Sequence, residues 1–102
     1  MIEKIARHYG IDHQSRQAIE EMAELTQALT KFWNYTGTDG TVLKSLKANI
    51  SEEMADVEIM LDQLKILFQN AEEVGEIRAY KLTRQLERMD SSAHSKETRK
   101  EK

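Results

Sequence analysis

The chain has 102 residues, enough for one compact core but too few for two. It has no cysteine, which excludes disulfides and thiolate metal sites. Its net charge is −3, and its basic residues become more frequent toward the C-terminus without forming a broad patch. This distribution disfavours polymeric nucleic acid as a partner.

Helix formers dominate the composition: proline is absent, only four glycines occur, and Glu, Lys, Leu and Ala are frequent, so we expect an all-α protein. The opening MIEKIARHYG lacks the long apolar core of a secretory signal, and no stretch approaches the roughly 18 apolar residues of a membrane span. We therefore expect a cytoplasmic protein with no membrane partner.

The first part of the chain predicts two helices. Residues 1–9 can form a short helix that ends at Gly10, and Asp12 is a suitable N-cap for a long helix to about Trp33. The apolar stripe expected on the long helix is Ala18, Met22, Leu25, Leu29 and Phe32. The acids expected on another side of it are Glu20, Glu21 and Glu24.

The middle of the chain predicts a loop and a second long helix. Residues 34–41, with two glycines and several turn formers, indicate the loop. Residues 42–48 can add a helical turn before Asn49 or Ser51 caps a helix to about Gln69.

The last predicted helix begins at Asn70, which forms a capping box with Glu73, and it runs to about Met89. One of its stripes is typical of core: Ala79, Leu82, Leu86 and Met89. A second row begins apolar and becomes cationic: Val74, Ile77, Lys81, Arg84 and Arg88. Such a change along one face suggests a helix that leaves the core to border a site, although a solvated basic end also complements the helix dipole and is preferred for Arg88.

These elements predict one helical domain over residues 1–89, followed by a disordered polar tail over 90–102. Three long amphipathic helices and one short helix leave much apolar surface for a chain of this size. We therefore expect a helical bundle whose four-helix-type core is completed by forming a homodimer or homotetramer.

Two acidic pairs carry the strongest functional signal. Glu21 and Glu24 lie in EEMAE, and Glu53 and Asp56 lie in EEMAD. Each pair is spaced i, i+3, so its carboxylates share one helix face about 4.5 Å apart along the axis. Two such pairs facing each other would form a set of oxygen ligands.

Glu53 also extends the apolar row of Val57, Met60, Leu64 and Leu67 backwards by one step. A carboxylate on a core-facing row is costly unless a cation or hydrogen-bond donors stabilise it. The alternative is that the row ends at Val57 and Glu53 lies in solvent, and for a single glutamate burial statistics favour that alternative. Repetition of the pair on a second helix favours a site.

The motif EExxE, followed after 28 residues by ExxD, resembles the all-α MazG-type nucleoside triphosphate pyrophosphohydrolases. The resemblance includes the apolar VEIMLDQL over 57–64 and the downstream Lys81 and Arg84, and it covers roughly residues 10–89.

This resemblance implies Mg²⁺-dependent hydrolysis of a nucleoside triphosphate between the α and β phosphates, with Mn²⁺ as a possible substitute. It implies that Lys81 and Arg84 bind phosphates and that Glu20 orients or deprotonates water, although a plain surface role for Glu20 is equally compatible. One or two ions are possible. The metal ligands it implies are Glu21, Glu24, Glu53 and Asp56.

Base contacts and other functions stay open at this point. Trp33 and Tyr35 can stack on a base, but Trp33 projects from the apolar side, which favours a core position; His13 and Gln14 are alternative contacts. A di-iron carboxylate protein ranks low, because neither acidic pair is the Glu-x-x-His that such a site needs. A non-catalytic helical interaction module remains the alternative from a different class.

Overall fold

The computed structural model describes the backbone of residues 1–101 and the side chains of residues 1–92. Three helices follow in order: α1 (Ile2–Asn34), α2 (Gly40–Leu67) and α3 (Ala71–Glu101). No strand occurs among the described residues, so the predicted all-α class is confirmed. None of the helices in this part of the chain combines the length and apolarity needed to cross a membrane.

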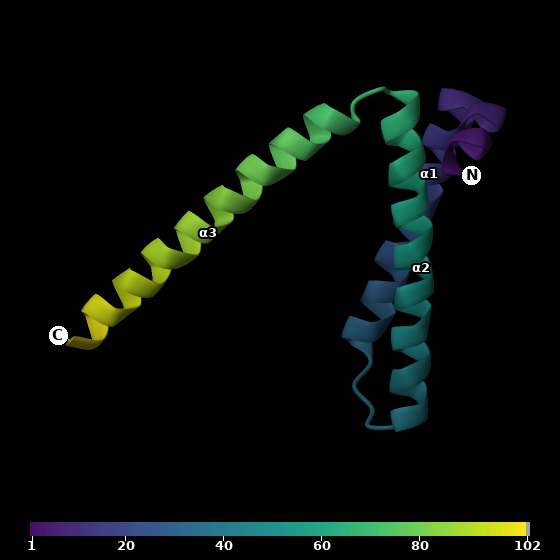
Figure 1. Ribbon diagram of the computed structural model, residues 1–102. Coiled ribbons are helices and arrows are strands. Elements are labelled where there is room, and N and C mark those ends of the chain that lie inside the picture. The colour runs from purple at the N-terminus through teal and green to yellow at the C-terminus, as the bar shows by residue number, and fades with distance from the viewer. Residues whose placement is uncertain (102) are drawn as a thin grey trace. The chain divides into compact units, whose positions relative to one another are not determined.

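The chain divides into two compact units, Met1–Gln69 and Asn70–Lys102. The first is a hairpin in which α1 and α2 lie side by side and run in opposite directions (Figure 1). The second consists of α3.

Gly10 interrupts α1, as the sequence predicted. Its backbone angles are φ 83° and ψ 171°, which are non-helical and lie in a region that essentially only glycine adopts. α1 is therefore two helical segments joined at this residue, and the longer one carries the acidic residues.

α2 begins earlier than predicted. The helix is continuous from Gly40, with Asp39 as its N-cap: the Asp39 carboxylate accepts from the backbone N–H groups of Thr41 at 2.9 Å and Val42 at 3.4 Å. The predicted caps at Asn49 and Ser51 are therefore wrong. The Asp39 cap satisfies free N–H groups at the start of α2, so residues 42–48 belong to the same helix. No second cap is needed farther along.

The loop before α2 is arranged around Tyr35. Its hydroxyl accepts from the Asp39 backbone N–H at 3.2 Å, which ties the two ends of the loop together. A Cβ atom on Gly37 would lie 2.5 Å from the same hydroxyl, so the loop needs glycine there. Tyr35 therefore shapes the loop that leads into α2.

The core of the hairpin is built from small and polar side chains. Among the described residues no large side chain is fully buried. The buried residues are Ala6, Gln14, Ala18, Ala28, Met60 and Gln63. Small side chains at the contact let two helix backbones approach closely.

The predicted α1 stripe is partly wrong, because Met22 and Leu29 are exposed. The covered row runs through Gln14, Ala18, Glu21, Leu25, Ala28 and Phe32, at alternating steps of four and three residues. On α2 the predicted row is covered: Met60 is buried, and Val57, Leu64 and Leu67 are half-buried. Glu21 therefore lies on the core-facing row of α1, in contrast to the prediction that it lies on another side.

α3 differs from the prediction at its start and along its apolar stripe. The Asn70 side-chain oxygen has no hydrogen-bond partner, so the predicted Asn70 side-chain cap is wrong. The predicted core residues Leu82, Leu86 and Met89 are exposed, because the unit contains no second helix for them to contact. The backbone of α3 is helical to Glu101, whereas Lys102 and the side chains from residue 93 lie outside the described residues; the disordered tail over 90–102 stays a prediction.

Gly10→Ala should destabilise the protein by about 1–3 kcal/mol, since a Cβ atom disfavours this backbone conformation even though open space surrounds it. The free energy of unfolding in urea measures the effect. Gly40→Ala is the matched control in the same hairpin: it also adds a methyl group in open space, but at an ordinary φ. The control should be neutral or stabilising by up to about 1 kcal/mol. Equal stability of the two variants would contradict the strain at residue 10.

Candidate metal centre

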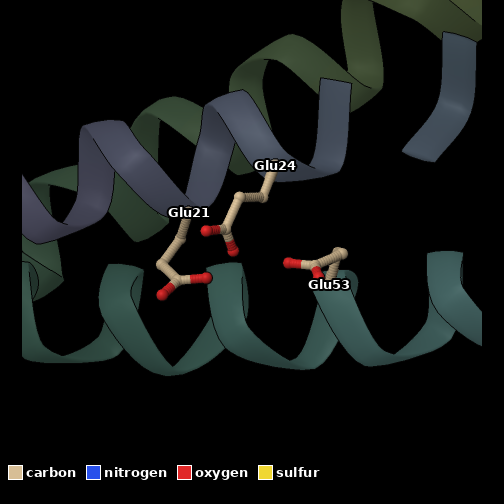
Figure 2. Close-up of side chains that lie close together, drawn as sticks. All are labelled: Glu21, Glu24 and Glu53. Atoms are coloured by element: carbon tan, nitrogen blue, oxygen red, sulfur yellow. The ribbon is translucent and has the colours of Figure 1, made fainter. Parts of the chain in front are cut away.

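Three carboxylates converge between α1 and α2. One carboxylate oxygen from each of Glu21, Glu24 and Glu53 lies within 4.8 Å of the others. Figure 2 shows Glu21 and Glu24 extending from α1 toward α2, with Glu53 reaching toward them from α2. We call these three residues the acidic cluster. The two predicted acidic segments therefore face each other.

A buried amide pair sets the register that brings the acids together. The Gln14 side-chain amide donates to the Gln63 carbonyl oxygen at 2.6 Å, and both side chains are buried. Seven residues along α1 from Gln14 is Glu21, and seven residues back along α2 from Gln63 is Asp56. Because the helices are antiparallel, Glu21 lies at the level of Asp56.

Asp56, the fourth predicted ligand, is half-buried on α2 and lies outside the three-residue cluster. Its negative charge nevertheless acts on Glu21, whose pKa it helps to raise. The structure therefore places all four predicted ligands in one region, with three of them in close proximity.

Two carboxylate oxygens of the acidic cluster are buried without a hydrogen-bond donor beside them among the described residues. Glu21 Oε1 accepts from the Gln17 side-chain amide at 2.9 Å, but Glu21 Oε2 and Glu53 Oε2 are buried with no hydrogen-bond partner. A desolvated carboxylate oxygen without a partner costs free energy, which a bound cation would offset. The prediction that the core-facing row of α2 extends back to Glu53 is confirmed, because the Glu53 carboxylate has a buried oxygen.

The electrostatics of the site are repulsive. The hydrogen bond from Gln17, the largest influence, lowers the pKa of Glu21, but desolvation and the nearby carboxylates of Glu24 and Asp56 together outweigh it. The net result is a pKa of Glu21 above its ordinary value of 4.5. Charge on this cluster therefore opposes folding in the absence of a cation.

The donor set fits a hard divalent cation. Mg²⁺ takes oxygen ligands at about 2.0–2.1 Å, so two oxygens on opposite sides of the ion lie about 4.2 Å apart. The oxygens of the acidic cluster lie within 4.8 Å of one another, which is close to this largest ligand separation, so small rotations of the side chains bring all three within reach of one ion. The residues present therefore fit Mg²⁺.

The other predicted functional residues lie elsewhere. Glu20 is exposed and lines a pocket on α1 instead of joining the acidic cluster. Lys81 and Arg84 belong to the α3 unit, where they line a pocket of about 240 Å³ with Gln85 and Arg88. We call this the α3 pocket.

The residues predicted to contact the base lie in different surroundings and do not form one site. Trp33 is 85% exposed, so the expectation of a core position is wrong. Tyr35 supports the loop, and Gln14 is part of the buried amide pair. His13 is exposed on α1 and lines the same pocket as Glu20.

Sequence reasoning missed the amide pair and the inward position of Glu21. Both follow from one signal, the heptad spacing of Gln14, Ala18, Glu21, Leu25 and Ala28. That row is weak as an apolar pattern, since glutamine and alanine are not strongly hydrophobic. Its spacing nevertheless matches a helix face that contacts another helix closely.

No family model matches the chain, and no curated protein or solved structure matches it. The functional assignment therefore depends on the residues and the geometry of the acidic cluster.

The raised pKa of Glu21 predicts a pH dependence of stability in metal-free solution. A carboxyl group with a raised pKa stabilises the fold fully below 4.5, and this contribution is lost as the pH rises through its higher folded-state pKa. Glu21→Gln should therefore unfold at higher urea concentration than the wild type at pH 7, with a difference that shrinks toward pH 4.5. Glu20→Gln, at the exposed neighbour, should follow the wild type. A Glu21→Gln curve parallel to the wild type would contradict the repulsion.

Proposed function

We propose that this protein is a MazG-type, Mg²⁺-dependent nucleoside triphosphate pyrophosphohydrolase. It cleaves between the α and β phosphates and releases a nucleoside monophosphate and pyrophosphate. The observation that carries the proposal is the inward placement of Glu21 and Glu53 on facing helices, with an unpartnered buried oxygen on each. A hard cation would supply the partner that these oxygens lack and could bind phosphates at the same time.

The proposed metal ligands are Glu21, Glu24, Glu53 and Asp56. These residues would hold Mg²⁺, or Mn²⁺ in its place, which would make a bound water more acidic and offset the negative charge of the triphosphate. The four carboxylates would hold the cation between α1 and α2, where partial burial strengthens electrostatic interactions. Glu24 is exposed and leaves the site open to substrate on its side.

Glu20 is the proposed catalytic acceptor of a proton. The reaction adds water across the P–O–P bridge: the water oxygen stays on one product, the bridging oxygen leaves with the other, and a proton is released. Glu20 follows directly before Glu21 in the EExxE motif and has an exposed carboxylate, which is able to accept a proton from water.

Lys81 and Arg84 are the proposed phosphate-binding residues. The α3 pocket combines three cationic side chains with one amide, which suits phosphate oxygens. Arg84 offers a two-pronged hydrogen-bonding group, and Lys81 offers a compact charge. The positive charge of these side chains would offset the negative charge of the triphosphate.

Oligomerisation forms part of the proposal, as a homodimer or homotetramer. The hairpin buries no large side chain fully, and exposed apolar side chains occur on it and on α3. Burial of these faces in further copies of the chain would complete a four-helix-type core.

A second candidate is a non-catalytic helical interaction module. The exposed stripe of Leu82, Leu86 and Met89 on α3 favours it, because such a stripe can contact a partner helix. This candidate predicts no response to divalent metal, so the first experiment below separates the two functions.

The proposed reaction predicts pyrophosphate release from nucleoside triphosphates only when Mg²⁺ or Mn²⁺ is present. Glu53→Gln should lower kcat/KM by about 100-fold or more, since it removes a charged ligand while keeping the shape of the side chain. Glu52→Gln, at the exposed neighbouring acid, is the matched control and should retain activity.

Thermal unfolding gives a second readout of the same site. Metal at one hundred times its Kd should stabilise the wild type by about 2.7 kcal/mol, and Glu53→Gln should lose this response. A folded wild type that releases no pyrophosphate from any triphosphate and ignores Mg²⁺ would favour the interaction module instead.

Arg84→Ala should raise KM for the triphosphate by about tenfold while metal binding, measured as thermal stabilisation, is retained. Arg78→Ala removes a cation from the same helix outside the α3 pocket and is the matched control. Unchanged kinetics in Arg84→Ala would remove this residue from the substrate site.

A further inference from the structure

A second pocket lies on α1, across the break at Gly10. It has a volume of about 550 Å³, within the range of about 300–1,000 Å³ that is usual for small-molecule sites. We call it the α1 pocket. Tyr9 comes from the segment before Gly10, and the other residues come from the segment after it: Asp12, His13, Arg16, Gln17 and Glu20.

The buried amide pair fixes the hydrogen-bonding state of His13. Gln14 uses its amide nitrogen to donate to Gln63, and its oxygen lies 2.6 Å from His13 Nδ1. That oxygen can only accept, so Nδ1 of His13 carries the proton. In the neutral ring, Nε2 of His13 is then a free acceptor.

The α1 pocket also contains a flat aromatic surface. The rings of Tyr9 and His13 are stacked, with centroids 4.7 Å apart and an interplanar angle of 18°. Both residues are exposed, so an outer ring face is available to a planar ligand. Aromatic side chains in such a position stack on nucleobases.

More side chains around this surface offer a hydrogen-bond acceptor than offer a cationic donor. Gln17 uses its amide nitrogen to donate to Glu21, which leaves its oxygen as an acceptor. Asp12 and Glu20 contribute carboxylates, and Arg16 contributes the cationic donor. A ligand edge that carries an N–H₂ group beside an acceptor therefore matches the pocket better than an edge with carbonyl oxygens alone.

The position of the α1 pocket suits the nucleoside end of a nucleotide. His13 and Glu21 are eight residues apart on one helix, or about 12 Å along the axis, a separation that the sugar and phosphate chain of one nucleotide can span. Gln17 belongs to both sites, because it lines the pocket and donates to Glu21.

We propose that the α1 pocket binds the base of the substrate and prefers a base with an exocyclic amino group, such as cytosine, over one with carbonyl groups only, such as uracil. The base stacks on the outer face of the Tyr9–His13 pair, and its amino group donates to the Asp12 carboxylate at the edge of the pocket. This inference rests on the proposed function, since it places the rest of the nucleotide toward the acidic cluster.

Nucleoside binding without phosphates or divalent metal tests the pocket separately from the reaction. Cytidine and uridine differ at the amino and carbonyl groups of the base edge, and titration followed by NMR should show cytidine binding about tenfold more tightly. Tyr9→Ala and His13→Ala should each weaken cytidine binding. His8→Ala is the matched control, because His8 contacts Tyr9 edge-on but does not line the pocket, and it should bind cytidine as the wild type does.

The outcomes separate this inference from the proposed function. Metal-dependent pyrophosphate release together with unchanged KM values for cytidine and uridine triphosphates in Tyr9→Ala and His13→Ala would overturn the inference and leave the function standing. Cytidine binding that requires Tyr9 and His13, without pyrophosphate release under any condition, would support the pocket and overturn the function. Equal affinity for cytidine and uridine would overturn the base preference.

Discussion

The hydrogen bond between Gln14 and Gln63 is the interaction on which the site depends. The two side chains are 3% and 2% exposed, so each amide needs its partner in the interior. A seam made only of alanine and methionine would tolerate a shift of one helix turn, whereas such a shift would leave both amides unpaired at a cost of about 1–3 kcal/mol each. The amide pair therefore selects the alignment in which Glu21 stands level with Asp56.

The same alignment concentrates an unfavourable feature in the centre of the hairpin. Glu21 and Glu53 interrupt the covered rows of both helices, and each buries an oxygen without a partner. Natural chains usually break the rules of core packing where function requires it, and they lose stability there. The placement of these carboxylates is understandable as a binding site and has no evident value as packing.

The helices, the break at Gly10 and the facing acidic segments follow from local signals in the sequence, because glycine conformation and i, i+3 spacing are local properties. The predictions at Asn49, Met22 and Leu86 were wrong for other reasons. Asp39 caps α2 ten residues before Asn49, so Asn49 lies inside the helix and does not act as a cap. Alanines formed the contact in place of Met22, since close helix approach is a property of two helices together. Leu86 is exposed because its own unit contains no second helix that could cover it.

The alanine row of α1 has a further consequence for the acidic cluster. Ala18 and Ala28 are nearly fully buried on either side of Glu21 in sequence, and their methyl groups determine how closely the two helix backbones approach. The width between the carboxylates of α1 and α2 is thus governed by residues that carry no charge. A cation is accepted according to its radius, and in this hairpin the volume of two methyl groups would determine which radius fits.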